Sequence, residues 1–96
     1  MDIIEKLIEL LVKKNQTEYE KTQVIAKVKP VGRDEFAAAG QSGYKASFML
    51  EVWDFEYTGQ TEVFMEEKKY SVYRTYGPKD SGKIELYVAE RVGKKG

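Results

Sequence analysis

The sequence contains neither cysteine nor histidine. The absence of cysteine excludes a disulfide framework, a thiolate nucleophile and a thiolate metal site. The absence of histidine removes the commonest general base and the commonest metal ligand in proteins. The serines therefore have no histidine to activate them, and a serine–lysine pair is the one serine arrangement left open. We accordingly predict a protein that is not an enzyme and that binds no cofactor and no metal.

The chain also has no surplus of either charge, since sixteen lysines and arginines balance sixteen aspartates and glutamates. Proteins that bind nucleic acid through its phosphates usually carry a basic surplus, so the balance argues against that class. The apolar run at residues 3–12 is interrupted by Glu5, Lys6 and Glu9. It is too polar for a membrane span, and no small-residue cleavage site of a signal peptide follows it. We expect synthesis in the cytosol and no membrane partner.

Short alternating segments fill most of the 96 residues and predict one mainly β domain over residues 1–96. Apolar and polar residues alternate at 23–31, 45–57, 61–65, 70–75 and 84–89. In the second of these runs the apolar phase changes at Val52 and Trp53, which predicts a bulge or a bent strand that points both at the core. Short strands at this spacing predict a small antiparallel β-barrel or sandwich.

The N-terminal residues 2–14 fit two different elements. Residues 3, 4, 7, 8 and 11 are apolar and lie on one helical face, and Asp2 and Glu5 have the spacing of a capping box. Alternation of Ile8, Leu10 and Val12 with their neighbours also fits a strand with both faces partly covered. Helix and strand therefore both remain open for this segment.

A short helix is predicted at residues 33–40. An alanine run follows Asp34 and Glu35, whose charges suit a helix N-terminus, and Gly40 suits the C-terminal end. Polar residues at 15–22 and charged residues at 66–69 predict connections between strands, and residues 58–60 predict a turn. The GPKDSG segment at 77–82 offers turn residues at almost every position.

Two groups of side chains have chemistry to be weighed. The first group consists of six carboxylates on two neighbouring predicted strands: Glu51, Asp54, Glu56, Glu62, Glu66 and Glu67. They fit either a metal-binding or hydrolytic site or, more simply, the solvated face of an acidic hairpin. The second group is aromatic and basic: Tyr70, Tyr73, Tyr76, Tyr87, Lys68, Lys69 and Arg74. It fits an oligonucleotide-binding barrel, or tyrosines that tile a sheet. We favour the structural interpretation of both groups.

Several blocks in fixed order resemble one protein family. They are DEFAAAGQSGYKASF at 34–48, WDFEYTGQTEVF at 53–64, YSVYRTY at 70–76 and IELYVAERVG at 84–93. Together these blocks look like the head closure proteins of tailed bacteriophages, also called head-tail joining, head-tail adaptor or stopper proteins. The likeness covers residues 24–93. It departs at the first turn, where the family tends to carry aspartate and glycine and this chain has KKNQTEYEK at 13–21.

The resemblance implies a virion neck protein, assembled in the bacterial host cytoplasm. It implies a homo-oligomeric ring, dodecameric in related necks, built from subunits that are monomeric alone. The ring would lie between a portal or adaptor protein above and a tail completion or terminator protein below, close to the packaged DNA, where it closes the filled head and offers a docking platform for the tail. Alternatives are a tail terminator ring or a small oligonucleotide-binding barrel.

Ring contacts between identical subunits join two different surfaces, and loops and strand edges are the usual means. The loop 15–22, the segment 32–43 and the turn 77–82 are our candidates. The residues that we predict for the assembly interface are Arg33, Asp34, Glu35, Phe36, Gln41, Tyr44, Pro78, Lys79 and Asp80. We expect Arg74 to pair with Glu85 or Glu90 on the neighbouring strand rather than with DNA.

Overall fold

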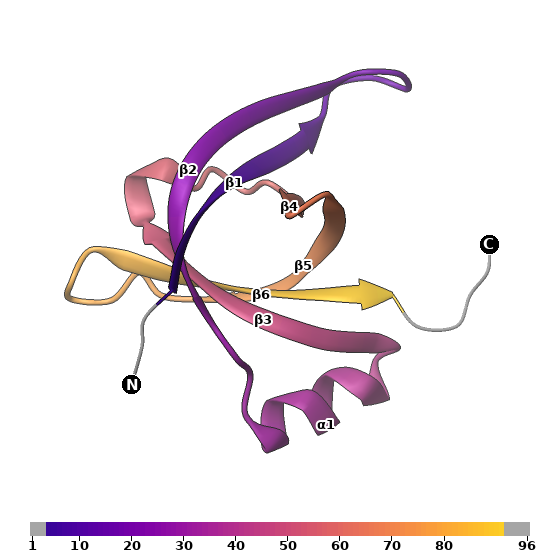
Figure 1. The fold of residues 1–96 in the computed structure, drawn as a ribbon, viewed down its shortest axis with the longest axis vertical. Helices are drawn as coiled ribbons and strands as arrows, with labels where there is room; N and C mark the ends of the chain where they lie inside the picture. Colours follow the sequence, from indigo (N-terminus) through magenta and orange to yellow (C-terminus); the bar gives the residue numbers. More distant parts are fainter. Residues whose placement is uncertain (1–3, 92–96) are drawn as a thin grey trace.

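The computed structural model describes residues 4–91 of the chain. Six strands and one α-helix follow one another in the order β1 (Ile4–Lys13), β2 (Tyr19–Lys29), α1 (Arg33–Gln41), β3 (Tyr44–Trp53), β4 (Glu62–Met65), β5 (Lys68–Tyr76) and β6 (Lys83–Arg91), with a 3-10 helix (Asp54–Glu56) after β3. The strands close an antiparallel barrel in the order β1-β2-β3-β6-β5-β4 (Figure 1). The predicted mainly β fold, with one helix near residues 33–40, is confirmed.

Inward-facing apolar side chains fill the barrel. Ile8, Leu10, Leu50 and Leu86 are among the largest fully buried residues and come from β1, β3 and β6. They belong to one cluster with the inward residues of β2, β4 and β5. Burial of such side chains is the main stabilising contribution in a chain of this size. The interior of the barrel is therefore a packed core.

The N-terminal segment is a strand, which decides between the two predicted elements. β1 pairs with β2 from Ile4↔Val28 to Lys13↔Tyr19, and Ile8 and Leu10 face the core while Leu7 faces outward. The helical periodicity is real in the sequence, but the ladder with β2 overrides it. Asp2, on which the predicted capping box depended, lies outside the described residues, as does the basic tail at 93–96.

The first loop is shorter than predicted. β2 begins at Tyr19, so only residues 14–18 connect it to β1. Asn15 Oδ1 accepts hydrogen bonds from the backbone N–H groups of Thr17 at 2.9 Å and Glu18 at 3.0 Å. An asparagine that bonds its own following backbone stabilises a tight turn. The polar residues 19–22 join the strand because β1 supplies their ladder partners.

The irregularities of the sheet differ from the predicted bulge at Val52 and Trp53. β3 ends at Trp53, and the 3-10 helix turns the chain away, so Trp53 and Phe55 are exposed instead of facing the core. That prediction was wrong. The register shifts lie elsewhere, between Ala46 and Phe48 on β3 and between Val72 and Arg74 on β5.

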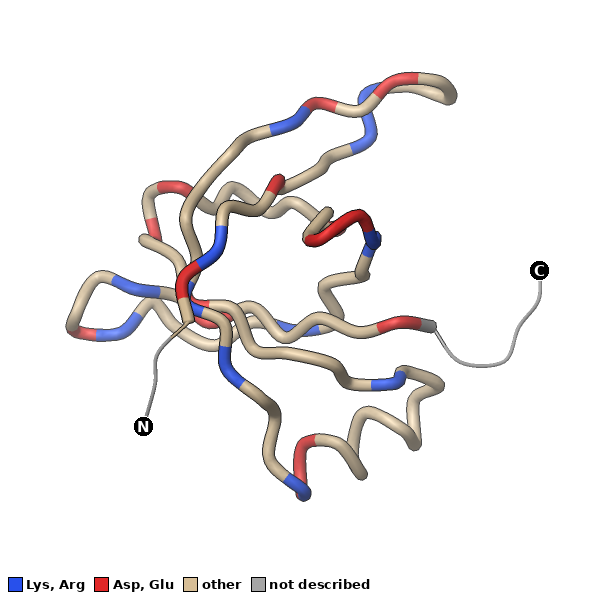
Figure 2. Tube along the Cα trace, viewed as in Figure 1, with Lys and Arg blue, Asp and Glu red and all other residues tan. Residues whose placement is uncertain are grey.

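Charged side chains are interspersed by sign along the chain (Figure 2). Between residues 4 and 91, no helix is long and apolar enough to cross a membrane.

Candidate assembly surfaces

A single carboxylate joins α1 to β5. Glu35 accepts a hydrogen bond from the Tyr73 hydroxyl at 2.6 Å and two from Arg74, from Nε at 3.1 Å and from Nη2 at 2.6 Å. Adjacent residues of a regular strand point to opposite faces. The register shift between Val72 and Arg74 breaks this alternation, so both side chains reach the same helix residue.

The prediction that Arg74 pairs with Glu85 or Glu90 is therefore wrong. Glu85 accepts a hydrogen bond from Lys79, and Glu90 pairs with Lys68. The error has a physical cause, because a prediction from strict alternation cannot include a bulge at Tyr73. Hydrogen bonding from Arg74 lowers the pKa of Glu35 below its ordinary value, so the carboxylate stays charged at neutral pH.

Tyrosines form a stacked group beneath α1. The Tyr44 and Tyr73 rings stack with centroids 5.2 Å apart, and the Arg74 guanidinium lies 3.9 Å from the Tyr87 ring centroid. Burial, followed by the contact with Glu35, raises the pKa of Tyr73, which keeps its hydroxyl a donor. The cavity of about 240 Å³ between α1 and these rings is lined by Glu35, Tyr73 and Arg74, which bond one another, together with small side chains of α1. These rings tile the sheet, as the structural interpretation of the tyrosines predicts.

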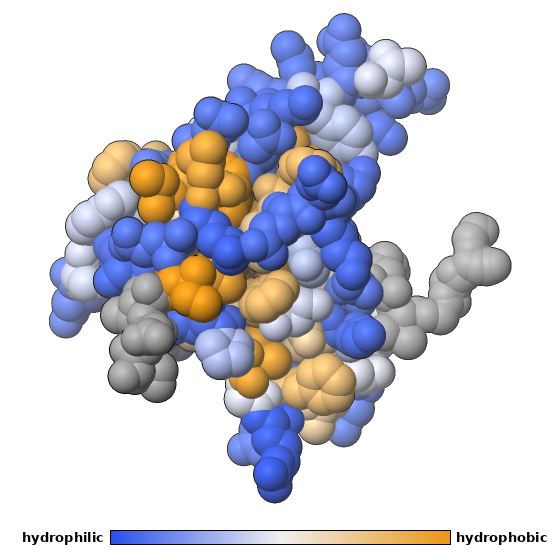
Figure 3. All heavy atoms as spheres, viewed as in Figure 1, coloured by the Kyte–Doolittle hydropathy of each residue, from blue (hydrophilic) through white to orange (hydrophobic). Residues whose placement is uncertain are grey.

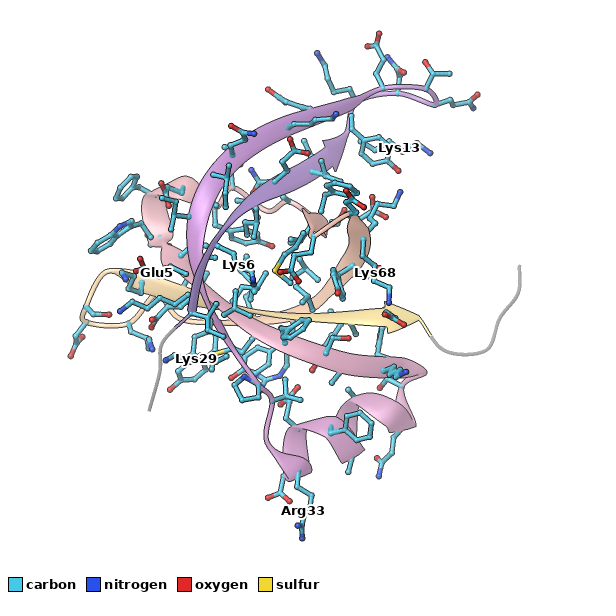
Figure 4. All side chains as sticks on the ribbon, in the orientation of Figure 1. Glu5, Lys6, Lys13, Lys29, Arg33 and Lys68 are labelled. Atoms are coloured by element: carbon cyan, nitrogen blue, oxygen red, sulfur yellow. The ribbon has the colours of Figure 1, made fainter. Side chains whose placement is uncertain are left out.

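The outward side of α1 is a convex surface that we call the α1 outer face, formed by Arg33, Phe36, Ala37 and Gly40. Helical spacing places these residues together, opposite the buried Ala39. Phe36 is 50% exposed, and a side chain added at Gly40 would point into open space. Arg33 points away from the barrel (Figure 4). Small residues beside an exposed aromatic ring let another surface approach closely.

A second surface opens where β2 and β3 part. The two strands pair from Lys29↔Met49 to Lys27↔Glu51 and then diverge. The resulting hollow, which we call the β2–β3 groove, has a volume of about 600 Å³ and is lined by apolar residues that include Leu7, Ile25 and Trp53. Charged residues line it as well, and four of them, Glu5, Glu56, Lys27 and Lys83, are called the groove rim below.

The groove combines exposed apolar side chains with charged ones and is open to solvent. Leu7 and Ile25 face each other on the outer side of β1 and β2 and are 60% and 61% exposed. Trp53 is 44% exposed, stacks on Phe55 with ring centroids 6.1 Å apart, and carries Lys83 Nζ at 4.4 Å from its ring centroid. Hydrophobic side chains gather over β1 and β2 in Figure 3. Contiguous exposed apolar groups of this kind mark interaction sites.

The turn at 77–82 is fastened to the barrel beside this groove. Lys79 Nζ lies 2.9 Å from both Glu51 Oε2 and Glu85 Oε2. Glu51 is buried, and the hydrogen bond from Lys79 lowers its pKa. The backbone N–H of Asp54 donates to the carbonyl oxygen of Gly82 at 2.8 Å, which ties the turn to the end of β3.

The predicted interface residues thus fall into two separate places. Arg33, Asp34, Glu35, Phe36, Gln41 and Tyr44 lie on or beside α1, whereas Pro78, Lys79 and Asp80 lie in the turn next to the groove (Figure 1). Glu35 and Lys79 are held by internal ion pairs, so neither is free to bind a partner.

The sequence reasoning missed the groove residues. The sequence signal that could have revealed the groove was the presence of apolar residues, Leu7 and Ile25, at outward-facing positions of β1 and β2.

The acidic residues do not form a common site. Glu51, Glu62 and Glu66 pair separately with Lys79, Lys69 and Lys6. Over residues 4–91, no group of three or more acidic residues is arranged to hold a metal ion.

The chain matches no protein-family model and no curated protein.

Proposed function

We propose that the chain is a structural subunit of a tailed-bacteriophage neck. It forms a homo-oligomeric ring under the portal or adaptor, closes the DNA-filled head and offers a platform to the tail. The observation that carries this proposal is the presence of two separate exposed apolar surfaces, the α1 outer face and the β2–β3 groove, on a barrel with a filled interior. Exposed apolar surfaces bordered by charges are typical of protein contacts.

The resemblance in sequence supports the phage part of the proposal. The quoted blocks correspond to α1 with the start of β3, the end of β3 with β4, β5, and β6. The proposal needs no catalytic group, because a ring subunit acts by contact and shape. Each of the two surfaces would meet a neighbouring subunit of the ring.

The oligonucleotide-binding alternative is weaker in this geometry. Tyr44, Tyr73 and Tyr87 stack on one another or on Arg74, so at least one face of each of these rings is occupied. Arg74 is neutralised by Glu35. Bases bind such barrels by stacking on open rings beside free cations.

Electron microscopy of the purified chain mixed with portal complexes or tail tubes of the same phage tests the proposal. We expect a ring on the lower rim of the portal. Rings found on tail tubes alone would assign the chain to tail termination instead, and binding to neither would refute a neck role.

A matched pair of variants adds a residue-level test. Phe36→Glu removes the exposed aromatic ring of the α1 outer face and should leave the barrel folded, because half of that side chain is already in solvent. Phe64→Glu changes an exposed phenylalanine on β4 and is the control. We expect the first variant to lose ring formation on the portal and the second to retain it.

A further inference from the structure

The two apolar surfaces differ in shape and lie on different sides of the molecule. Figure 4 shows Arg33 at the outer end of α1 and Glu5, a residue of the groove rim, beside the strands of the barrel. The α1 outer face is convex around Phe36, and the β2–β3 groove is hollow. A contact between two different surfaces of identical subunits is heterologous and repeats from one subunit to the next.

We propose that the α1 outer face of one copy docks in the β2–β3 groove of the next, with Phe36 placed against Leu7, Ile25 and Trp53. This inference rests on the proposed function in one respect, because it takes the neighbour in the ring to be a second copy of this chain.

The apolar groups of the two surfaces are suited to each other in size. Phe36 is half exposed, and the groove of about 600 Å³ has ample room for one aromatic ring and the helix turn that carries it. Ala37 and Gly40 flank Phe36 and let the helix backbone approach the rim of the groove. An aromatic side chain that fills a partner's hydrophobic pocket is the usual anchor of a protein interface.

The charges of the two surfaces are complementary as well. Arg33 and Asp34 have no ion-pair partner within residues 4–91, and in the same part of the chain Glu5 and Glu56 of the groove rim have none either. Arg33 of the α1 outer face suits these two carboxylates. Opposite charges around an apolar centre fix the register of a contact.

Symmetric pairings fit less well. Docking α1 on α1 would leave both grooves empty, and docking groove on groove would leave two hollows facing each other. Neither arrangement fills the groove. The head-to-tail arrangement fills it and leaves a free groove at one end and a free α1 outer face at the other, so further copies can add.

The limited size of the contact predicts a low affinity between two isolated copies. The contact uses a single face of a nine-residue helix and one groove, whereas stable interfaces bury roughly 1,200 Å² or more of total area. We therefore expect weak association in dilute solution and strong association once a portal holds several copies at high effective concentration.

Cysteine cross-linking tests the arrangement directly, because the natural chain has no cysteine. Ala37→Cys on the α1 outer face and Gln23→Cys in the groove leave Phe36 and Ile25 in place. They are prepared as separate variants and as a double variant, and all are treated with a short bismaleimide at high protein concentration. We expect each single variant alone to stay uncross-linked and their mixture to give a dimer. The double variant should give a ladder of increasing length. Ala37→Cys mixed with Phe64→Cys is the control and should give none.

The pattern of cross-links distinguishes a head-to-tail contact from a symmetric one. Cross-linking of either single variant with itself at the yield of the mixture would show a symmetric contact and overturn the inference. A mixture that gives no dimer, even on portal-bound rings, would overturn it as well. Rings on the portal without this cross-link would leave the neck function standing, whereas the cross-link without portal binding would support the inference and count against the neck function.

A charge exchange gives an independent measure. Arg33→Glu should lower the cross-linking yield about threefold, since one exposed ion pair contributes roughly 0.2–1 kcal/mol. Mixing that variant with a groove partner that carries Glu56→Lys should restore the yield. Equal yields in all combinations would show that these charges do not face each other.

Discussion

Removal of the Glu35 charge should loosen α1 while leaving the barrel intact. Glu35 is 17% exposed and accepts three hydrogen bonds, and Arg74 is 44% exposed. Because Arg74 is largely in solvent, its pair with Glu35 contributes about 0.5–1 kcal/mol. The bond from Tyr73 adds about 1 kcal/mol, so Glu35→Gln should cost about 1–2 kcal/mol in all.

The loss should appear locally. Ala39 is the buried residue of α1, and a nine-residue helix is too short to persist without tertiary contacts. A loss of about 1–2 kcal/mol in the local stability of α1 raises the population of molecules in which the helix is open roughly 5- to 30-fold. Native-state hydrogen exchange of the α1 amides measures this population. Glu90→Gln removes an ion pair with Lys68 and is the matched control.

Two results would refute this reasoning. Unchanged exchange of the α1 amides in Glu35→Gln would show that the hydrogen bonds to Tyr73 and Arg74 do not hold the helix. Equal acceleration in α1 and in the central strand β6 would show that the bonds stabilise the whole barrel instead.

Three further predictions concern pH, the core and the groove. Hydrogen bonds from Arg74 and Lys79 lower the pKa of Glu35 and Glu51, so their contribution to stability is present above about pH 5 and is lost as the pH falls through and below about 4.3, the ordinary pKa of glutamate. Urea titrations from pH 7 to pH 3 should show this fall, and Glu35→Gln should make it shallower. Leu86→Ala empties a fully buried site and should cost about 2–5 kcal/mol in the same titrations, without changing the urea dependence of the unfolding free energy. Trp53 is the only tryptophan, so self-association should shift its emission to shorter wavelength at the high protein concentrations used for cross-linking, and Phe36→Glu should abolish the shift; an unchanged spectrum at concentrations where the cross-link forms would contradict docking at the groove.

Most of the barrel could be predicted from the sequence, because inward-facing apolar residues alternate clearly with outward-facing ones in β3 and β6. Leu50 and Val52, like Leu86 and Val88, are predicted on one face and are buried. The turn at 77–82 and the helix near residues 33–40 were also predictable, since their residue types have strong local preferences.

The bulges and the groove were not predictable from local patterns. A register shift depends on the partner strand, and the shift at Tyr73 decides that Arg74 meets Glu35. The exposure of Trp53 depends on where β2 and β3 separate, which the residues of β3 alone do not determine. Of the interface residues predicted around α1, Arg33 and Phe36 lie on the α1 outer face. The internal ion pairs of Glu35 and Lys79 depend on contacts between distant segments, so the sequence could not reveal them.

The parting of β2 from β3 also bears on solubility. Over residues 19–26, β2 has no ladder partner on its second side in the part of the chain that the structure describes. Bare strand edges invite uncontrolled aggregation, and charged residues on the edge oppose it. Glu20 and Lys21 stand at this edge and are exposed. These charges oppose pairing with another strand at the far end of β2, whereas the edge beside Ile25 keeps an exposed apolar side chain.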